Sequence, residues 1–258
     1  MKFCIYYINL DRSPERRAFM DRQLSRLNFP YSRVAAVDGR DLNMRNLSAF
    51  AVPARVEEWK HLLTPNAIAC SMSHRKAYAA ALADGVDVAL ILEDDIAFLP
   101  SFEAVVQQAV GRSRMQDVCL LYFHGPDKTF LRDQATHLNG GFGIYRAKTS
   151  WGAYAAGAYL IQRDTIKRLH DHVFPVHTTA DSWGTFCRDG VINGLSAVLP
   201  LPTADAPFAS GIGYGRFPRL KNMLTRSPLG QRLLSLVRTH LKPIPHGYRI
   251  TDEQPESI

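Results

Sequence analysis

The sequence predicts one large α/β domain with a mostly parallel central sheet flanked by helices, and three observations support this. The apolar runs at residues 3–8, 86–92 and 118–123 are nearly continuous, which is typical of strands covered on both faces. Helical patterns lie between these runs, and alternating strands and helices form parallel βαβ units. A chain of 258 residues with 46% hydrophobic residues is long enough to bury one substantial core.

The first elements are a strand over residues 3–8 and a helix in which Ser13 can cap and Pro14 suits the first position. The apolar residues of this helix recur on one stripe: Met20, Leu24 and Leu27. A second strand is predicted over 31–37, because the turn dipeptide Asp38-Gly39 follows it. The chain therefore begins strand, helix, strand.

The next helix begins at Thr64 and Pro65 and ends at Gly85, directly before the strand over 86–92. Ser101 then caps a helix that runs to about Val110.

After the strand over 118–123, the glycine-rich stretch 140–157 predicts hairpins or a loop that closes on a ligand. Short helices are predicted at 164–170 and 181–187.

The charge and cysteine content narrow the class of protein. Thirty-one Lys and Arg residues against 24 Asp and Glu give a net charge of +7, which favours anionic partners such as nucleotides or phosphorylated lipids. The four cysteines are far apart, without C-x-x-C spacing, and predict free thiols in a reducing cytosol: Cys4, Cys70, Cys119 and Cys187.

The first apolar run ends at Leu10 before an acid and several arginines, so it is interpreted as a core strand and not as a signal peptide. No run approaches the roughly 20 apolar residues that span a bilayer.

Three consecutive acids, Glu93, Asp94 and Asp95, follow the apolar run that ends at Leu92. Ligands of such sheets bind beyond the carboxyl ends of the strands, which is where these acids lie. Burying three carboxylates without compensation is costly, and a divalent cation such as Mg²⁺ or Mn²⁺ would remove that cost. A solvated acidic loop is the alternative, and local chemistry leaves the two readings about even.

Local sequence does not decide the roles of three other polar residues. His74 lies on a predicted helix, where a lone histidine is more often structural than catalytic. Asp11 and Arg12 end the first strand, where they either cap the next helix or face a ligand.

Five motifs occur in a characteristic order and spacing: INLDRSPERR at 8–17, AVDG at 36–39, IACSMSH at 68–74, LILEDD at 90–95 and GAYLI at 157–161. Together they resemble glycosyltransferase family 25, which contains bacterial lipopolysaccharide and lipooligosaccharide sugar transferases and resembles the collagen galactosyltransferases. The similarity covers about residues 3–190. It departs from many relatives before the third motif, where Asn66 and Ala67 replace a Gly-Glu pair and Ala69 replaces a glycine.

The resemblance implies a GT-A type, Rossmann-like nucleotide-sugar-binding fold and a UDP-sugar donor, with galactose or glucose as the hexose. It also implies Mn²⁺ or Mg²⁺ held by the acidic motif Glu93, Asp94 and Asp95. Within the motif, Asp95 and Glu93 are the predicted metal ligands; Asp95 is favoured, and the alternative for Glu93 is a structural role. The residues expected on the donor side are Asn9, Asp11, Arg12, Arg16, Asp38, Ser73, His74 and Asp94.

Bacterial members of the family generally invert the anomeric carbon, which requires one base to accept the proton of the acceptor hydroxyl. Asp181 is the predicted base. The alternative is that Asp181 caps a short helix whose Trp183 packs in the core.

The predicted catalytic domain covers residues 1–205, and residues 206–258 are predicted to form a basic C-terminal segment. Residues 206–250 contain no acid, and an amphipathic helix is predicted over 227–241. This helix either packs on the domain or binds an anionic membrane surface. His246 is considered as an additional metal ligand, against the alternative of a free surface histidine.

The expected acceptor is a lipid-linked oligosaccharide at the inner face of the cytoplasmic membrane, and no nucleic-acid partner is expected. Two other functions are weighed. A metal-dependent phosphohydrolase would use an acid as nucleophile and show further phosphate-binding signatures, which the sequence lacks. A catalytically silent sugar-nucleotide or glycan-binding protein is the other alternative, and the intact acids argue against it.

Overall fold

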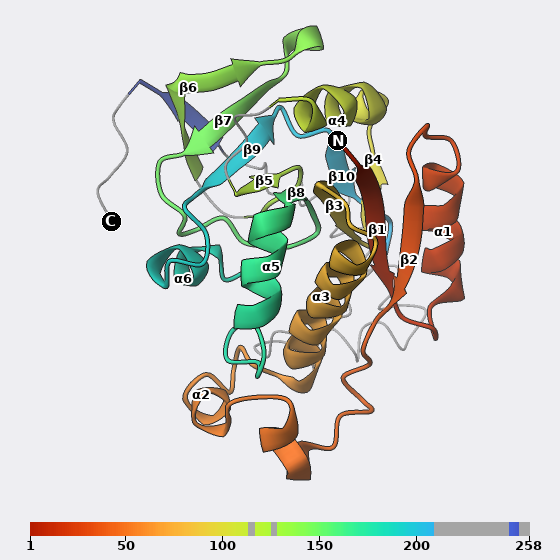
Figure 1. Ribbon diagram of the computed structural model, residues 1–258, viewed down its shortest axis with the longest axis vertical. Helices are drawn as coiled ribbons and strands as arrows, with labels where there is room; N and C mark the ends of the chain where they lie inside the picture. The colour runs from red at the N-terminus through yellow and green to blue at the C-terminus, as the bar shows by residue number, and fades with distance from the viewer. Residues whose placement is uncertain (113–116, 125–127, 209–247, 253–258) are drawn as a thin grey trace, which may run out of the picture.

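The structure is a computed structural model that describes residues 1–112, 117–124, 128–208 and 248–252 (Figure 1). Within these residues a nine-stranded sheet has the order β2-β1-β3-β8-β5-β9-β7-β6-β11. The strands are β1 (Phe3–Asn9), β2 (Tyr31–Ala35), β3 (Val88–Glu93), β5 (Val118–Leu120), β6 (Lys128–His137), β7 (Gly143–Ala147), β8 (Ala158–Gln162), β9 (Leu195–Leu199) and β11 (Tyr248–Thr251).

The sheet is mixed, which corrects the prediction of a mostly parallel sheet. Strands β2, β1 and β3 are parallel, as the βαβ pattern predicts. Strand β8, however, lies antiparallel between β3 and β5, and β7 pairs antiparallel with both β6 and β9. The reason is the glycine-rich stretch, which returns the chain through loops, because a parallel neighbour requires a long crossover that is usually helical.

Helices cover both faces of the sheet. They are α1 (Pro14–Leu24), α2 (Pro53–Glu58), α3 (Pro65–Ala83), α4 (Phe102–Val110), α5 (Arg163–His172) and α6 (Trp183–Arg188), with short 3₁₀ turns η1 (Met44–Ala49) and η2 (Asn139–Gly141). Helices α3, α5 and α6 pack on one face, and α1 and α4 pack on the other. A hydrophobic core lies on each face of the sheet, and β1 contributes to both. Its side chains alternate, so Tyr6 and Ile8 pack on the face of α3, and Ile5 and Tyr7 pack on the face of α1.

The helix starts follow the sequence in part. Thr64 caps α3 through its Oγ1, which accepts a hydrogen bond from the backbone N–H of Ala67 at 3.3 Å. Ser13 and Ser101 precede α1 and α4 as expected but make no side-chain cap hydrogen bond. A two-stranded sheet of β4 (Ile96–Phe98) and β10 (Thr203–Asp205) lies beyond β3.

The C-terminal segment is described only at its beginning and at residues 248–252. Strand β11 pairs with β6 in the main sheet. The predicted amphipathic helix over 227–241 and His246 lie outside the described residues, so the division at residue 205 stays a prediction. Among the described residues, none of the helices combines the length and apolar character that a membrane crossing needs. All four cysteines are free thiols.

Candidate active site

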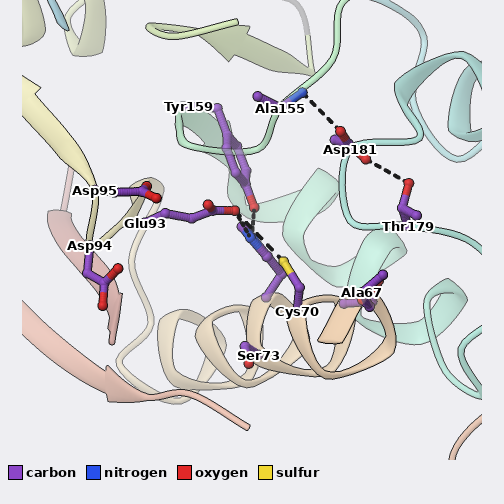
Figure 2. Close-up of polar contacts among 12 residues, drawn as sticks. Ala67, Cys70, Ser73, Glu93, Asp94, Asp95, Ala155, Tyr159, Thr179 and Asp181 are labelled. Atoms are coloured by element: carbon purple, nitrogen blue, oxygen red, sulfur yellow. Dashed lines mark hydrogen bonds and ion pairs between the residues drawn. The ribbon is translucent and has the colours of Figure 1, made fainter. Parts of the chain in front are cut away.

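The acidic motif lies where β3 ends. Glu93 is the last residue of β3, and Asp94 and Asp95 form the turn to β4. The backbone N–H of Glu93 donates to the carbonyl of Gly157 at 2.8 Å, which ties the end of β3 to the start of β8. Figure 2 shows Asp94 turned away from Glu93 and Asp95. The three acids therefore face two different environments.

Asp94 is buried in a network with two other residues of the predicted donor side. Its carboxylate accepts hydrogen bonds from Nδ2 of Asn9 at 2.7 Å and from Nη1 of Arg16 at 2.5 Å. Asn9 is 1% exposed, and its Oδ1 in turn accepts from Nε of Arg33 at 3.0 Å. The network joins the end of β1 to α1, so Asp94 acts on the site by fixing Arg16, which also lies 3.5 Å from Asp95.

Asp95 is an acid whose charged form is disfavoured by its surroundings. Burial, followed by the negative charge of Glu93, raises the pKa of Asp95 to about 7, although Arg16 partly opposes this. Two neighbouring carboxylates at the wall of a cavity are the donor set that a hard divalent cation prefers. Glu93 and Asp95 therefore fit a Mn²⁺ or Mg²⁺ ion.

We expect the raised pKa of Asp95 to make the metal-free protein sensitive to pH. Folded Asp95 keeps its proton up to about pH 7, whereas the unfolded chain loses that proton near pH 4. The contribution of this group to stability is therefore complete below about pH 4 and is lost as the pH rises through about 7. Asp95→Asn should gain stability over the wild type between pH 5 and 8, by about 1 kcal/mol or more.

Urea unfolding of both proteins in EDTA at pH 5, 6, 7 and 8 measures this gain. A difference in unfolding free energy that does not change with pH would contradict the assignment.

Glu93 is oriented by a buried chain of polar side chains from α3 and β8. Nε2 of His74 lies 3.2 Å from Oε1 of Glu93, and Nδ1 of His74 lies 2.9 Å from the hydroxyl of Tyr159. The carboxylate only accepts, so Nε2 carries a proton, and in the neutral ring Nδ1 accepts from Tyr159. Tyr159 then accepts from Tyr78, 2.8 Å away. His74 is therefore a positioning residue for Glu93.

Cys70 joins this group, although sequence reasoning did not include it. Its Sγ lies 3.8 Å from Oε1 of Glu93, and ligand atoms of Cys70, His74 and Glu93 lie within 4.8 Å of one another. Burial raises the pKa of the Cys70 thiol well above its usual value, and a neutral thiol is a poor metal ligand. The arrangement favours oxygen ligands. The spacing i, i+4 between Cys70 and His74 on α3 was the signal that could have revealed this contact.

Two cavities meet at the acids. The larger has a volume of about 660 Å³, and the smaller about 120 Å³. Both are lined by Cys70, Glu93 and Asp95. The smaller cavity also contains most of the predicted donor side: Arg12, Arg16, Asp38, Ser73, His74 and Asp94. The structure thus brings these residues together at one side of the acidic motif.

The wall of the smaller cavity is held by charged and polar contacts. Nε of Arg12 donates to Asp38 at 2.5 Å, and Arg40 donates to the same carboxylate at 2.7 Å. Arg40, followed by the weaker effect of Arg12, holds the pKa of Asp38 well below its usual range. Ser73 accepts from the backbone N–H of Val37 at 2.8 Å and so ties α3 to this wall.

Asp11 lies apart from the other predicted residues. It is absent from the lining of both cavities, its side chain is 78% exposed, and it pairs with Arg33 at 2.5 Å.

Asp181 lines the larger cavity from the loop before α6. Its carboxylate accepts from the backbone N–H of Ala155 at 3.0 Å and from Oγ1 of Thr179 at 2.6 Å (Figure 2). The N-cap residue of α6 is Ser182, so the alternative in which Asp181 caps this helix is wrong. Within the part of the chain that the structure describes, these two donors hold the carboxylate at the cavity wall, which leaves it lone pairs that can accept a proton.

Further polar groups of the larger cavity were missed by sequence reasoning. The hydroxyl of Tyr122 donates to Asp205 and lies 2.5 Å from Nε2 of His124. Tyr122 and His124 follow β5, whose carboxyl end lies at the same sheet edge as that of β3, and this position was a usable signal. Asp205 had no such signal, because it reaches the cavity through the pairing of β10 with β4.

A third cavity, of about 440 Å³, adjoins the larger one and shares Tyr154, Thr179 and Asp181 with it. Its wall includes the aromatic residues Trp59 and Trp151, of which Trp151 is 55% exposed. Ligand pockets are lined mainly by apolar and aromatic side chains with a few polar groups, and this cavity has that kind of lining.

Known proteins are similar to this chain over 43% to 81% of its length. A "Glycosyltransferase 25 family member" of Aedes aegypti is 34% identical over 114 residues, which is 43% of this chain and 19% of that protein. One of Anopheles gambiae is 25% identical over 232 residues, 81% of this chain and 38% of that protein. The "Inactive glycosyltransferase 25 family member 3" of Mus musculus is 29% identical over 120 residues, 45% of this chain and 19% of that protein.

The matches therefore span about a fifth to two fifths of these relatives' lengths. In a structural comparison with a solved glycosyltransferase involved in the glycosylation of the major capsid of PBCV-1, the match covers 98% of this chain and 82% of that chain, with 10% sequence identity and a TM-score of 0.33. The model of "Glycosyltransferase family 25 (LPS biosynthesis protein)" matches residues 3–183, well over half of the chain. The chain belongs to glycosyltransferase family 25.

Proposed function

We propose that this protein is an inverting, metal-assisted glycosyltransferase of the GT-A type that moves galactose or glucose from a UDP-sugar to a lipooligosaccharide or lipopolysaccharide acceptor. The observation that carries the proposal is the meeting of two cavities at Glu93 and Asp95. A donor bound across this junction would have its nucleotide in one cavity and its sugar in the other. Family membership supports a sugar donor and a glycan acceptor.

On the donor side, the smaller cavity offers cations and hydrogen-bonding groups. Arg12 and Arg16 supply the positive charge that suits a diphosphate, and Asp38 suits a uridine or ribose hydroxyl. Glu93 and Asp95 would hold Mn²⁺ or Mg²⁺, which when bound would neutralise the charge that develops on the departing UDP.

On the acceptor side, Asp181 is the base. It would take the proton from the acceptor hydroxyl while that oxygen attacks the anomeric carbon from the face opposite UDP. Thr179 and the N–H of Ala155 keep the carboxylate in place for this transfer. Tyr122 and Asp205 would bind sugar hydroxyls in the larger cavity.

The aromatic cleft formed by Trp59, Trp151 and Tyr154 continues the acceptor side away from the acids. Aromatic faces stack on the C–H faces of sugars, so we expect Trp151→Ala to raise the KM for an oligosaccharide acceptor about tenfold, the equivalent of about 1.4 kcal/mol. The KM for the donor should stay unchanged. Initial-rate kinetics with Tyr31→Ala as an exposed aromatic control on β2 measures this, and an unchanged acceptor KM would contradict the assignment.

Release of UDP tests the proposed function directly. The purified protein is incubated with a panel of UDP-sugars and Mn²⁺, with and without a lipooligosaccharide acceptor. UDP release that requires the acceptor and one UDP-hexose supports transfer.

Donor binding without UDP release under any acceptor would favour a catalytically silent binding protein, an alternative to consider because some relatives are named inactive. Rapid phosphate release from simple phosphoesters would favour a phosphohydrolase. Transfer to an acceptor carried on lipid vesicles then tests whether the protein acts at a membrane surface, as we propose for the inner face of the cytoplasmic membrane.

A further inference from the structure

A second group of metal-ligating side chains lies away from the acidic motif. His172 is the last residue of α5, His177 lies in the following loop, and Asp189 follows α6. Nε2 of His172 lies 3.3 Å from Nε2 of His177 and 3.7 Å from Oδ2 of Asp189. One ligand atom from each residue lies within 4.8 Å of the other two. None of the three residues lines the cavities of the candidate active site.

The hydrogen bonding of His177 presents a lone pair to this group. Nδ1 of His177 lies 3.0 Å from the carbonyl oxygen of Pro175, which can only accept, so Nδ1 carries the proton. In the neutral ring, Nε2 is then unprotonated and directed at His172. A histidine whose Nδ1–H is fixed by a backbone carbonyl, and whose Nε2 therefore carries a lone pair, is the usual arrangement of a metal ligand.

The other two residues are also prepared for a ligand. Nε of Arg188 donates to Oδ1 of Asp189 at 2.9 Å, which leaves Oδ2 towards His172. The ring of His172 lies between the other two residues, with its Nε2 within 3.7 Å of both Nε2 of His177 and Oδ2 of Asp189. The side chains of His172 and Asp189 are 28% and 29% exposed, so an ion can reach them from solvent.

We propose that His172, His177 and Asp189 bind a divalent transition-metal ion of the zinc class through Nε2, Nε2 and Oδ2, with water as the fourth ligand. Two nitrogens at about 2.0–2.1 Å from one tetrahedral ion lie about 3.3 Å apart, which matches the separation of the two histidine nitrogens. Imidazole ligands select zinc over magnesium or manganese, so this site and the acidic motif would take different ions. In the metal-free protein Nε2 of His172 donates to the lone pair of His177, and this proton moves to Nδ1 of His172 as the ion binds.

An ion at this position would join the end of α5 to the end of α6. The segment 173–188, which includes α6, would then be closed at both ends by the metal. An ion that binds only the folded chain stabilises it by mass action, so zinc should raise the melting temperature.

Zinc titration of the EDTA-treated full chain tests the proposal, with the double variant His172→Gln/His177→Gln and the control His170→Gln. His170 lies on the same helix but pairs with Asp171 instead. The wild type and the control should bind one zinc ion here and gain melting temperature, whereas the double variant should lose at least about 100-fold in affinity. Cobalt as a probe separates this site from Cys70, because cobalt at Cys70 would give a near-ultraviolet sulfur charge-transfer band and cobalt here would not.

Equal zinc affinity in the double variant and the wild type, or no zinc bound by the wild type at about 100 µM, would overturn the proposal. Should the double variant fail to fold, Asp189→Asn serves instead, with an expected loss of about tenfold in affinity. The unchanged affinity of that variant would be equally decisive. These outcomes are independent of the proposed transferase activity.

Discussion

Asp95→Asn is expected to lower the turnover of sugar transfer by about 10²–10³-fold and to remove its dependence on Mn²⁺. Asparagine keeps the shape of the side chain but removes the charge that would hold the cation beside Glu93. Loss of folding would not explain the result, because this substitution should stabilise the metal-free protein above pH 7. UDP release at several Mn²⁺ concentrations measures both effects.

The matched control is Asp171→Asn, which removes an exposed carboxylate that pairs with Lys167 on α5. This variant should turn over like the wild type. If Asp95→Asn keeps wild-type turnover and wild-type Mn²⁺ dependence, then the acidic motif does not hold the metal.

Asp181→Asn should bind UDP like the wild type yet lose about 10²–10⁴-fold in turnover, because the amide cannot accept the acceptor proton. The carboxylate lies on the wall of the larger cavity, apart from the lining of the smaller one, which explains why nucleotide binding should persist. Calorimetric titration with UDP and single-turnover transfer separate the two steps.

Thr179→Val gives a graded comparison, because it removes one of the two hydrogen bonds that hold Asp181. Thr179 only positions Asp181, so its loss should lower turnover about tenfold, which corresponds to one hydrogen bond to a charged group. A turnover of Asp181→Asn near that of the wild type would reject Asp181 as the base.

Much of the fold was predictable because its first half follows local rules. Continuous apolar runs mark β1 and β3, and Thr64 and Pro65 mark the start of α3. The direction of β8 was not predictable, because no crossover helix precedes it and strand direction then depends on how loops pack.

The sequence points to most of the polar residues that line the smaller cavity, but not to their arrangement. The motifs point to Asn9, Arg16 and Asp94, yet their mutual hydrogen bonds require β1, α1 and β3 to be assembled. Asp205 and the N–H of Ala155 reach the larger cavity only through the packing of distant segments. Local sequence carries no information on such contacts.

The most direct test of the account is the position of manganese in a crystal of the protein with UDP, located by anomalous diffraction. The account predicts an anomalous peak bound by Glu93 and Asp95 at the junction of the two cavities, with the diphosphate on the other side of the ion and the uridine towards Asp38. Manganese bound elsewhere, or UDP bound away from the smaller cavity, would contradict it.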